Sequence, residues 1–165
     1  MTIPRLCPER PFPSYRFTPK KNPHPLKEGG HSFGEAEPVA SPMDSSRPYE
    51  SEFFLYALDL FNHGYYWESH VYLEALWNAH ERKGDLAHLF LGLIKLAAAG
   101  VKWRLGHDSP TLGHLKRAKE HFENLSTYQI AGLSKQELIE LVDSIKVPLL
   151  DGEIVYNFTI TPQND

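Results

Sequence analysis

The sequence contains one cysteine, Cys7, so no disulfide can form within the chain. No stretch approaches 18 consecutive apolar residues, and the first residues lack the apolar run of a secretory signal. These absences predict a cytoplasmic protein without a membrane partner. Cys7 also has no histidine or second cysteine near it in sequence, which argues against a catalytic or metal-binding role for its thiol.

An excess of positive charge is also missing. The formal net charge is −4, so the chain has no overall basic surface for nucleic acid, and no nucleic-acid partner is expected. Three common catalytic signatures are absent as well, namely His-Glu-x-x-His, a Gly-rich phosphate loop and Gly-x-Ser-x-Gly. The sequence therefore identifies neither a reaction nor a cofactor, and no cofactor is predicted.

Proline is concentrated at one end of the chain. Ten of the 13 prolines lie within residues 1–48, where they exclude a regular helix or a central strand. We therefore predict a Pro-rich extended arm over residues 1–47, partly docked or disordered. Interspersed aromatic residues favour docking from about Tyr15 onward, and the run Asn22-Pro23-His24-Pro25 indicates specific turns.

The next 100 residues have the periodicity of helices. Apolar side chains recur at helical spacing in five segments, and cap residues or glycines mark their ends. This pattern predicts an all-α domain over residues 48–147, a compact bundle of about five helices in hairpins. The remaining residues, 148–165, are predicted to form an extended tail. The expected helices are 48–62, 65–82, 86–105 (with Asp85 as its cap), 109–124 and 135–147 (with Ser134 and Glu137 as a capping box).

The segment 86–105 differs from the others because it is apolar on two sides. A helix with two apolar sides is buried on both, so this helix is predicted to be central. Gly92 and the run 97–100, Ala-Ala-Ala-Gly, would let a neighbouring helix approach closely.

The segment 65–82 carries polar residues at unexpected positions. On a helical wheel of 100° per residue, His70, Glu74 and Trp77 share one face with Tyr66, in the middle of the apolar stripe. Glu68 falls on the opposite side and is predicted to be solvated. A carboxylate that faces a core is unfavourable unless it is paired or protonated, and residues four apart on a helix can touch.

Three interpretations of this face remain open. The first is a structural His70–Glu74 pair that fixes the helix. The second is a ligand- or peptide-binding pocket lined by His70, Glu74, Trp77, Tyr66 and Lys95. The third is a divalent-metal or hydrolytic site in which the arm residues His24 and His31 join His70 and Glu74. Zinc usually needs three or four protein ligands and this helix supplies two, so the third interpretation needs His63 or the arm histidines to complete the set.

Two blocks of sequence resemble a known family. The first block, residues 61–77, contains Phe-Asn-His-Gly-Tyr-Tyr-Trp-Glu-Ser-His and then Leu-Glu-Ala-Leu-Trp. The second block runs from Leu91 to Ala99 and reads Leu-Gly-Leu-Ile-Lys-Leu-Ala-Ala-Ala. Together they resemble the signature of the family catalogued as domain of unknown function 309, over about residues 50–125. The arm is similar to an N-terminal extension found in a bacterial subset, through its segments 15–19, 23–25 and 30–32.

The resemblance implies an all-α fold of packed helical hairpins and no established activity. His70, Glu74 and Trp77 match the signature position by position. Val71 stands where the family commonly has glutamate, and Leu91 where it has glutamine. If those polar residues belong to a family active site, this chain has lost part of it.

The expected function is therefore a non-enzymatic binding or scaffold protein with a polar pocket around His70 and Glu74. Its partner would be an unidentified small ligand or protein. The alternative is a metal-dependent or acid–base enzyme that uses the same two residues with arm histidines. The sequence leaves the oligomeric state open.

Overall fold

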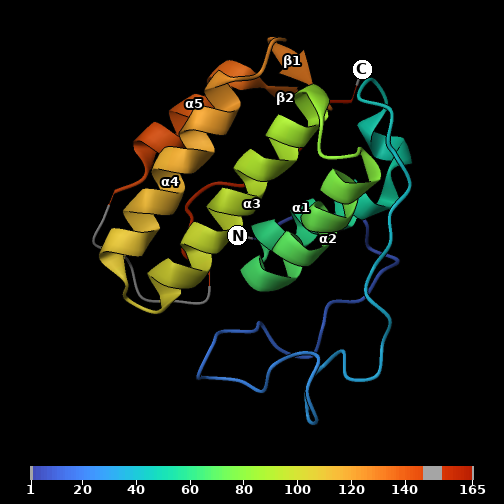
Figure 1. Cartoon of the computed structure of the whole chain (residues 1–165), viewed down its shortest axis with the longest axis vertical. Coiled ribbons are helices and arrows are strands. Elements are labelled where there is room, and N and C mark those ends of the chain that lie inside the picture. The colour runs from blue at the N-terminus through green and yellow to red at the C-terminus, as the bar shows by residue number, and fades with distance from the viewer. Residues whose placement is uncertain (1, 147–153, 165) are drawn as a thin grey trace.

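A computed structural model describes residues 2–146 and 154–164. It confirms an all-α protein with five helices, to which it adds one short 3₁₀ helix and one two-stranded hairpin (Figure 1). In chain order the elements are η1 (Pro48–Glu50), α1 (Glu52–Asn62), α2 (Tyr66–Ala79), α3 (Gly84–Arg104), α4 (Asp108–Glu123), β1 (Gln129–Ile130), β2 (Leu133–Ser134) and α5 (Lys135–Ser144).

Helix α3 is central, as its two apolar sides predict. It packs against α2 on one side and α4 on the other, and α1 and α5 extend the bundle from α2 and α4 respectively (Figure 1). Within the described part of the chain, α3 alone is long and apolar enough to cross a membrane. More than half of that stretch is buried inside the bundle, so its place in the core accounts for its apolar composition.

Small residues on α3 allow its neighbours to approach closely, also as predicted. A Cβ added to Gly92 would lie 2.3 Å from the Phe122 ring of α4. A Cβ added to Gly100 would lie 2.7 Å from the Tyr66 ring of α2. Both separations are shorter than van der Waals contact, so each glycine makes room for an aromatic ring.

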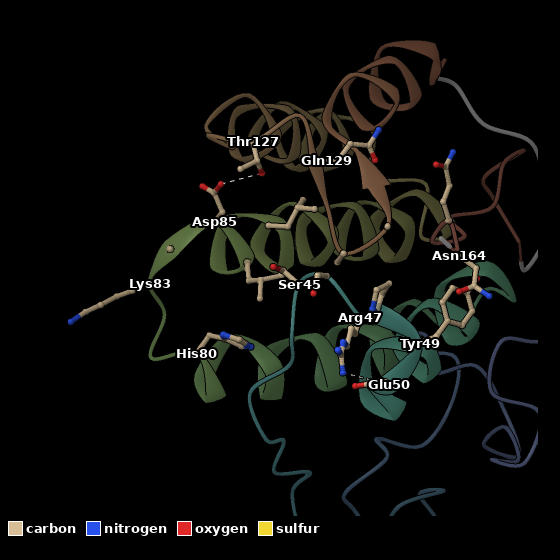
Figure 2. A pocket seen from close by; sticks show the side chains of 18 residues that line it. Ser45, Arg47, Tyr49, Glu50, His80, Lys83, Asp85, Thr127, Gln129 and Asn164 are labelled. Carbon is tan, nitrogen blue, oxygen red and sulfur yellow. Dashed lines mark hydrogen bonds and ion pairs between the residues drawn. The ribbon is translucent and has the colours of Figure 1, made fainter.

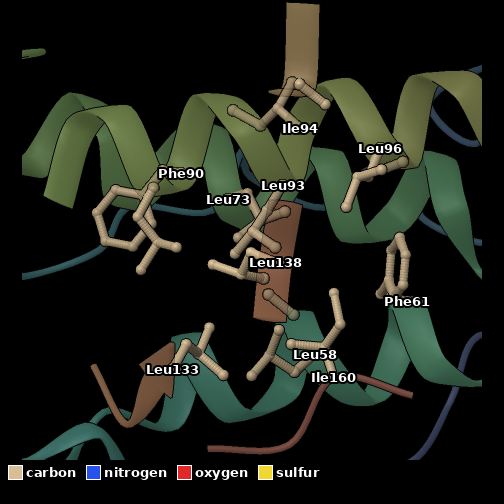
Figure 3. Packing of buried hydrophobic residues seen from close by; sticks show 14 of the residues in the cluster. Leu58, Phe61, Leu73, Phe90, Leu93, Ile94, Leu96, Leu133, Leu138 and Ile160 are labelled. Atoms are coloured by element: carbon tan, nitrogen blue, oxygen red, sulfur yellow. The ribbon is translucent and has the colours of Figure 1, made fainter. Parts of the chain in front are cut away.

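One hydrophobic core joins all five helices (Figure 3). Figure 3 shows that α3 supplies the middle of this cluster and that both α1 and the C-terminal tail pack onto it. Its labelled members are Leu58 and Phe61 of α1, Leu73 of α2, Phe90, Leu93, Ile94 and Leu96 of α3, Leu133 of β2, Leu138 of α5 and Ile160 of the tail.

The predicted helix boundaries are correct to within a few residues, with two instructive errors. Residues 48–50 form a separate 3₁₀ turn, because Ser51 caps α1 by accepting a hydrogen bond from the Phe54 amide. Helix α3 begins at Gly84 rather than after an Asp85 cap. The predicted Ser134 cap of α5 is present. Helix α5 ends at Ser144, and the predicted end at residue 147 lies outside the described residues.

The N-terminal arm docks much earlier than Tyr15, which corrects the sequence prediction. One anchor near its start is the carboxylate of Asp59, fully buried on α1. This carboxylate accepts hydrogen bonds from the amides of Leu6 (2.7 Å) and Cys7 (2.8 Å) and from Arg5 Nε (2.9 Å). A buried carboxylate needs such donors, so the start of the arm is part of the folded structure.

The described tail, 154–164, is extended as predicted and packs beside the same helices. Asn62 of α1 holds it with a reciprocal pair of hydrogen bonds, because its side chain donates to the Ile160 carbonyl and accepts from the Ile160 amide. The Tyr66 hydroxyl accepts a hydrogen bond from the Val155 amide. Side chains of α1 and α2 thus hold the two chain ends by hydrogen bonds to the backbone of the arm and of the tail.

Candidate functional site

Glu68 occupies the opposite environment to the one predicted. The helical wheel placed it in solvent, but the residue is only 3% exposed because the arm lies across that face of α2. Its Oε2 atom accepts two hydrogen bonds from the arm. One comes from the Phe17 amide at 2.9 Å and the other from His31 Nε2 at 2.7 Å. The buried His–Glu pair of this protein therefore joins α2 to the arm, and it uses neither His70 nor Glu74.

The second carboxylate oxygen of Glu68 is buried without a hydrogen-bond partner among the described residues. An unsatisfied buried acceptor is unfavourable by about 1–3 kcal/mol, so such groups are uncommon in folded proteins. Glu68 Oε1 thus lacks the donor that a buried carboxylate oxygen normally has.

The arm holds His31 in place with a compact loop. Gly30 approaches the loop's own backbone so closely that an added Cβ would lie 2.2 Å from the His24 carbonyl oxygen. The Tyr15 hydroxyl accepts from the His31 amide at 3.1 Å and donates to the Pro23 carbonyl at 2.6 Å. The Tyr15 ring also packs on the imidazole, with centroids 4.6 Å apart. These contacts fix the ring that meets Glu68.

The other nitrogen of His31 contacts a hydroxyl. His31 Nδ1 lies 2.7 Å from Ser32 Oγ. Glu68 can only accept, so the neutral imidazole carries its hydrogen on Nε2 and leaves Nδ1 as an acceptor for the Ser32 hydroxyl. The structure therefore aligns a serine, a histidine and a glutamate in one hydrogen-bonded chain.

These residues line a cavity of about 840 Å³ between the arm and α2, here named the arm–α2 cavity. Its polar lining includes His31, Ser32 and His70 together with the carboxylates of Glu35, Glu37, Glu68 and Glu74. Its aromatic lining comes from the arm and from both N-terminal helices, with Phe12, Phe53, Tyr56, Trp67 and Tyr72.

Arg10 forms one wall of the arm–α2 cavity and attaches the arm to aromatic rings. Its guanidinium lies 4.5 Å from the Tyr56 ring centroid and 5.2 Å from that of Tyr72. It also donates to the Tyr72 hydroxyl at 3.2 Å and lies 3.6 Å from Glu52. The positive charge of Arg10 is thus largely engaged by the protein itself.

His70 and Glu74 form the predicted pair but are not core residues. Their side chains are 35% and 42% exposed and lie 3.0 Å apart, at the edge of the arm–α2 cavity. Partial burial lowers the pKa of His70, and Lys95 adds to the lowering, while Glu74 opposes it. The helical wheel therefore predicted too much burial for His70 and Glu74 and too little for Glu68.

The other predicted pocket residues do not line this cavity. Tyr66 is fully buried in the core. Trp77 packs beside the core with the Arg82 guanidinium 4.6 Å from its ring, and its buried indole nitrogen has no partner among the described residues. Lys95 is half-buried on α3. The cavity lies between α2 and the arm, and of the predicted pocket residues it contains His70 and Glu74.

Three of the four predicted metal ligands, His31, His70 and Glu74, line the arm–α2 cavity, but among the described residues their donor atoms do not form a group within 4.8 Å of one another. His24 packs its ring against Phe17 and Trp67. In the described ranges, the one group of three possible donors within 4.8 Å of one another is Cys7, Glu9 and Glu52. Burial, helped by a hydrogen bond to Glu9, raises the pKa of the Cys7 thiol to about 12. Cys7 would have to lose this proton to bind a metal, and Glu52 is 59% exposed, so the group lacks the enclosed donor set of a structural metal site.

A second cavity of about 760 Å³ lies at the other end of α2 (Figure 2). Its charged groups are already matched, because Asp85 accepts from Ser126 and Thr127, and Arg47 lies 3.6 Å from Glu50. Figure 2 shows Lys83 extending away from the cavity. The arm–α2 cavity is the stronger candidate because it alone combines a buried unsatisfied carboxylate with histidines.

Residues 54–112 match the sequence model of the family described as Domain of unknown function (DUF309). Over these residues the chain is similar to the DUF309 family. No curated protein and no solved structure matches the chain. The DUF309 segment contains Asp59, Asn62 and Glu68, and each of these buried side chains hydrogen-bonds to the arm or to the tail, outside the matched residues.

Sequence reasoning missed Glu68 and Ser32 as site residues. Glu68 lies within the family signature, directly after Trp67, which was a usable signal. Ser32 lies in segment 30–32 of the arm, one of the segments that resemble the N-terminal extension of a bacterial subset. Neither signal predicts that His31 links the two residues, which are 36 positions apart in sequence.

Proposed function

We propose that this protein is a binding protein whose ligand is a small molecule with a positively charged nitrogen. The arm–α2 cavity is its site. The observation that supports this best is the buried Oε1 of Glu68, an acceptor without a partner among the described residues of a cavity lined by carboxylates and aromatic rings. An ammonium or guanidinium group supplies the donor and the charge that this acceptor needs.

The charge of the arm–α2 cavity favours a cation. Four carboxylates line it, whereas its one arginine, Arg10, already contacts Tyr56, Tyr72 and Glu52. A concave site with an excess of one charge attracts the opposite charge. The aromatic wall favours the same ligand, because cations bind over ring faces and apolar groups pack on them.

The size of the cavity is compatible with a small molecule. Ligand sites in proteins are typically about 300–1,000 Å³, and this cavity measures about 840 Å³. The arm covers it and supplies Ser32 and His31, so binding should also stabilise the docked arm.

A thermal-shift titration tests the proposal. Agmatine, spermidine and choline are compared with acetate and glycerol at constant ionic strength. At least one amine should raise the melting temperature in a concentration-dependent way, while acetate and glycerol should not. A ligand at 100 times its Kd stabilises the folded state by about 2.7 kcal/mol.

Matched variants connect binding to the cavity. Glu74→Gln removes one carboxylate from the cavity edge and should weaken amine binding several-fold. Glu123→Gln removes an equal charge from α4 and should leave binding unchanged. The absence of a shift with every amine, or equal binding by the two variants, would overturn the proposal.

The alternative, acid–base chemistry, is favoured by one observation in the same cavity. Two His–Glu pairs line it, His31–Glu68 at 2.7 Å and His70–Glu74 at 3.0 Å. Paired imidazoles are common general bases. Of the two pairs, only His31–Glu68 also lies within hydrogen-bond distance of a hydroxyl, that of Ser32.

A further inference from the structure

We propose that Ser32 is a nucleophile, activated by His31 and Glu68, that hydrolyses small carboxylic esters in the arm–α2 cavity. The inference rests on the proposed function only in placing the substrate in the same cavity. It adds a reaction, which binding alone does not require.

The hydrogen-bonded chain has the order that nucleophilic catalysis needs. Ser32 Oγ lies 2.7 Å from His31 Nδ1, and His31 Nε2 lies 2.7 Å from Glu68 Oε2. Both distances fall within the reach of about 2.6–3.2 Å expected between a nucleophile, its base and the group that orients the base. The Phe17 amide also binds Glu68 Oε2 and so orients the carboxylate.

The direction of the hydrogen bonds also fits. Glu68 accepts from Nε2, so Nδ1 of the neutral ring is the basic nitrogen and faces the serine hydroxyl. In the familiar serine hydrolases Nε2 faces the serine and Nδ1 binds the carboxylate, the reverse of the arrangement here. Either nitrogen can act as the base when the other is held by a carboxylate.

Burial separates the base from bulk water while the nucleophile stays reachable. The His31 side chain is 4% exposed and that of Glu68 is 3% exposed. Ser32 is only half-buried and lines the cavity. Interactions between charges and dipoles are stronger in such a water-poor site than at the surface.

Neighbours in sequence can meet by chance, so the rigidity of the Ser32 backbone is important. The Ser32 amide donates to the Pro25 carbonyl at 3.0 Å, and the Ser32 carbonyl accepts from the Glu35 amide at 3.0 Å. Together with Gly30 and Tyr15, these bonds hold residues 31 and 32 in one arrangement. The hydroxyl and the imidazole are therefore pre-positioned.

The chemical steps balance without a cofactor. Ser32 Oγ attacks the ester carbonyl carbon and passes its proton to His31 Nδ1. The bond between that carbon and the alcohol oxygen breaks, and the departing alkoxide takes the proton as an alcohol. Water then attacks the acyl-serine, giving its proton to Nδ1. The carboxylic acid leaves as the bond to Oγ breaks, and Oγ recovers the proton.

Covalent labelling tests the nucleophile directly. The full-length protein is treated with a small alkyl phosphonofluoridate, and its intact mass is measured. The wild type should gain one phosphonyl group with loss of fluoride, and peptide mapping should place it on Ser32. Ser32→Ala should not be labelled, whereas Ser41→Ala, which removes an exposed serine of the same arm, should be labelled like the wild type.

The role of the other two residues needs separate readouts. His31→Gln and Glu68→Gln should each slow labelling at least 10-fold while circular dichroism shows retained helix. If either variant loses its helices, His31→Asn or Glu68→Asp replaces it, because each shortens the side chain, lengthens the hydrogen bond to its partner and should likewise slow labelling. Ser32→Ala should also reduce 4-nitrophenyl acetate hydrolysis to the buffer rate.

Failure of this inference is distinguishable from failure of the proposed function. The proposal is wrong if the wild type gains no mass, if the label lies elsewhere, or if Ser32→Ala hydrolyses the ester like the wild type. Amine binding by the wild type in the thermal-shift titration is independent of those results. A protein that binds amines but resists the probe is a binding protein only.

Discussion

At the scale of single residues, the burial of two glutamates differs from the sequence prediction. Glu68 was expected in solvent and is buried, whereas Glu74 was expected in the core and is partly exposed. The helical wheel describes only how a helix presents its own side chains. It contains no information on the arm, which covers the outer face of α2 through Phe17 and His31. The residue types of the site could therefore be predicted, but not which carboxylate is buried.

Substitution of the two glutamates tests this difference in burial. Glu68→Gln removes the charge that binds His31 and the Phe17 amide, and should lower the free energy of unfolding by about 1–3 kcal/mol. Glu74→Gln alters a pair that is more than one-third exposed, and should change it by less than about 1 kcal/mol. Urea denaturation at pH 7 measures both values.

The contrast between the two variants decides the point. Equal effects, or a larger loss for Glu74→Gln, would mean that the face of α2 predicted from the wheel is the buried one.

At the scale of elements, periodicity and caps predict most of the fold. The five helices, the central position of α3 and the Ser134 cap follow from patterns within each segment. The hairpin of β1 and β2 has two residues per strand, too few for an alternating pattern. Docking of the arm depends on contacts between residues more than 50 positions apart, such as Leu6 with Asp59, which no local pattern encodes.

Close helix packing gives a prediction at this scale. Gly100→Ala places a Cβ 2.7 Å from the fully buried Tyr66 ring and should destabilise the protein by about 1–3 kcal/mol. Gly113→Ala is the matched control on α4, where the nearest atom is 3.6 Å away. The control should stabilise the protein by up to about 1 kcal/mol, because alanine favours helix over glycine.

Thermal or urea unfolding of both alanine variants measures the difference. A Gly100→Ala protein as stable as the Gly113→Ala protein would show that α2 and α3 are not packed as closely as described.

At the scale of the whole molecule, the arm and the tail complete the DUF309 segment. Asp59, Asn62 and Glu68 are buried in that segment, and their hydrogen-bond partners come from residues outside the family match. Without the two chain ends, three buried polar side chains would lose their partners. The arm is thus a structural part of the protein, and it also forms one side of its candidate site.

Native-state hydrogen exchange of the arm amides, followed by NMR, tests this central claim most directly. The amides of Leu6, Cys7 and Phe17 donate to buried carboxylates on α1 and α2. We predict that they exchange at least about 100-fold more slowly than an unstructured chain, since exchange requires the arm to open. Exchange of these three amides at the rate of an unstructured chain would contradict the account.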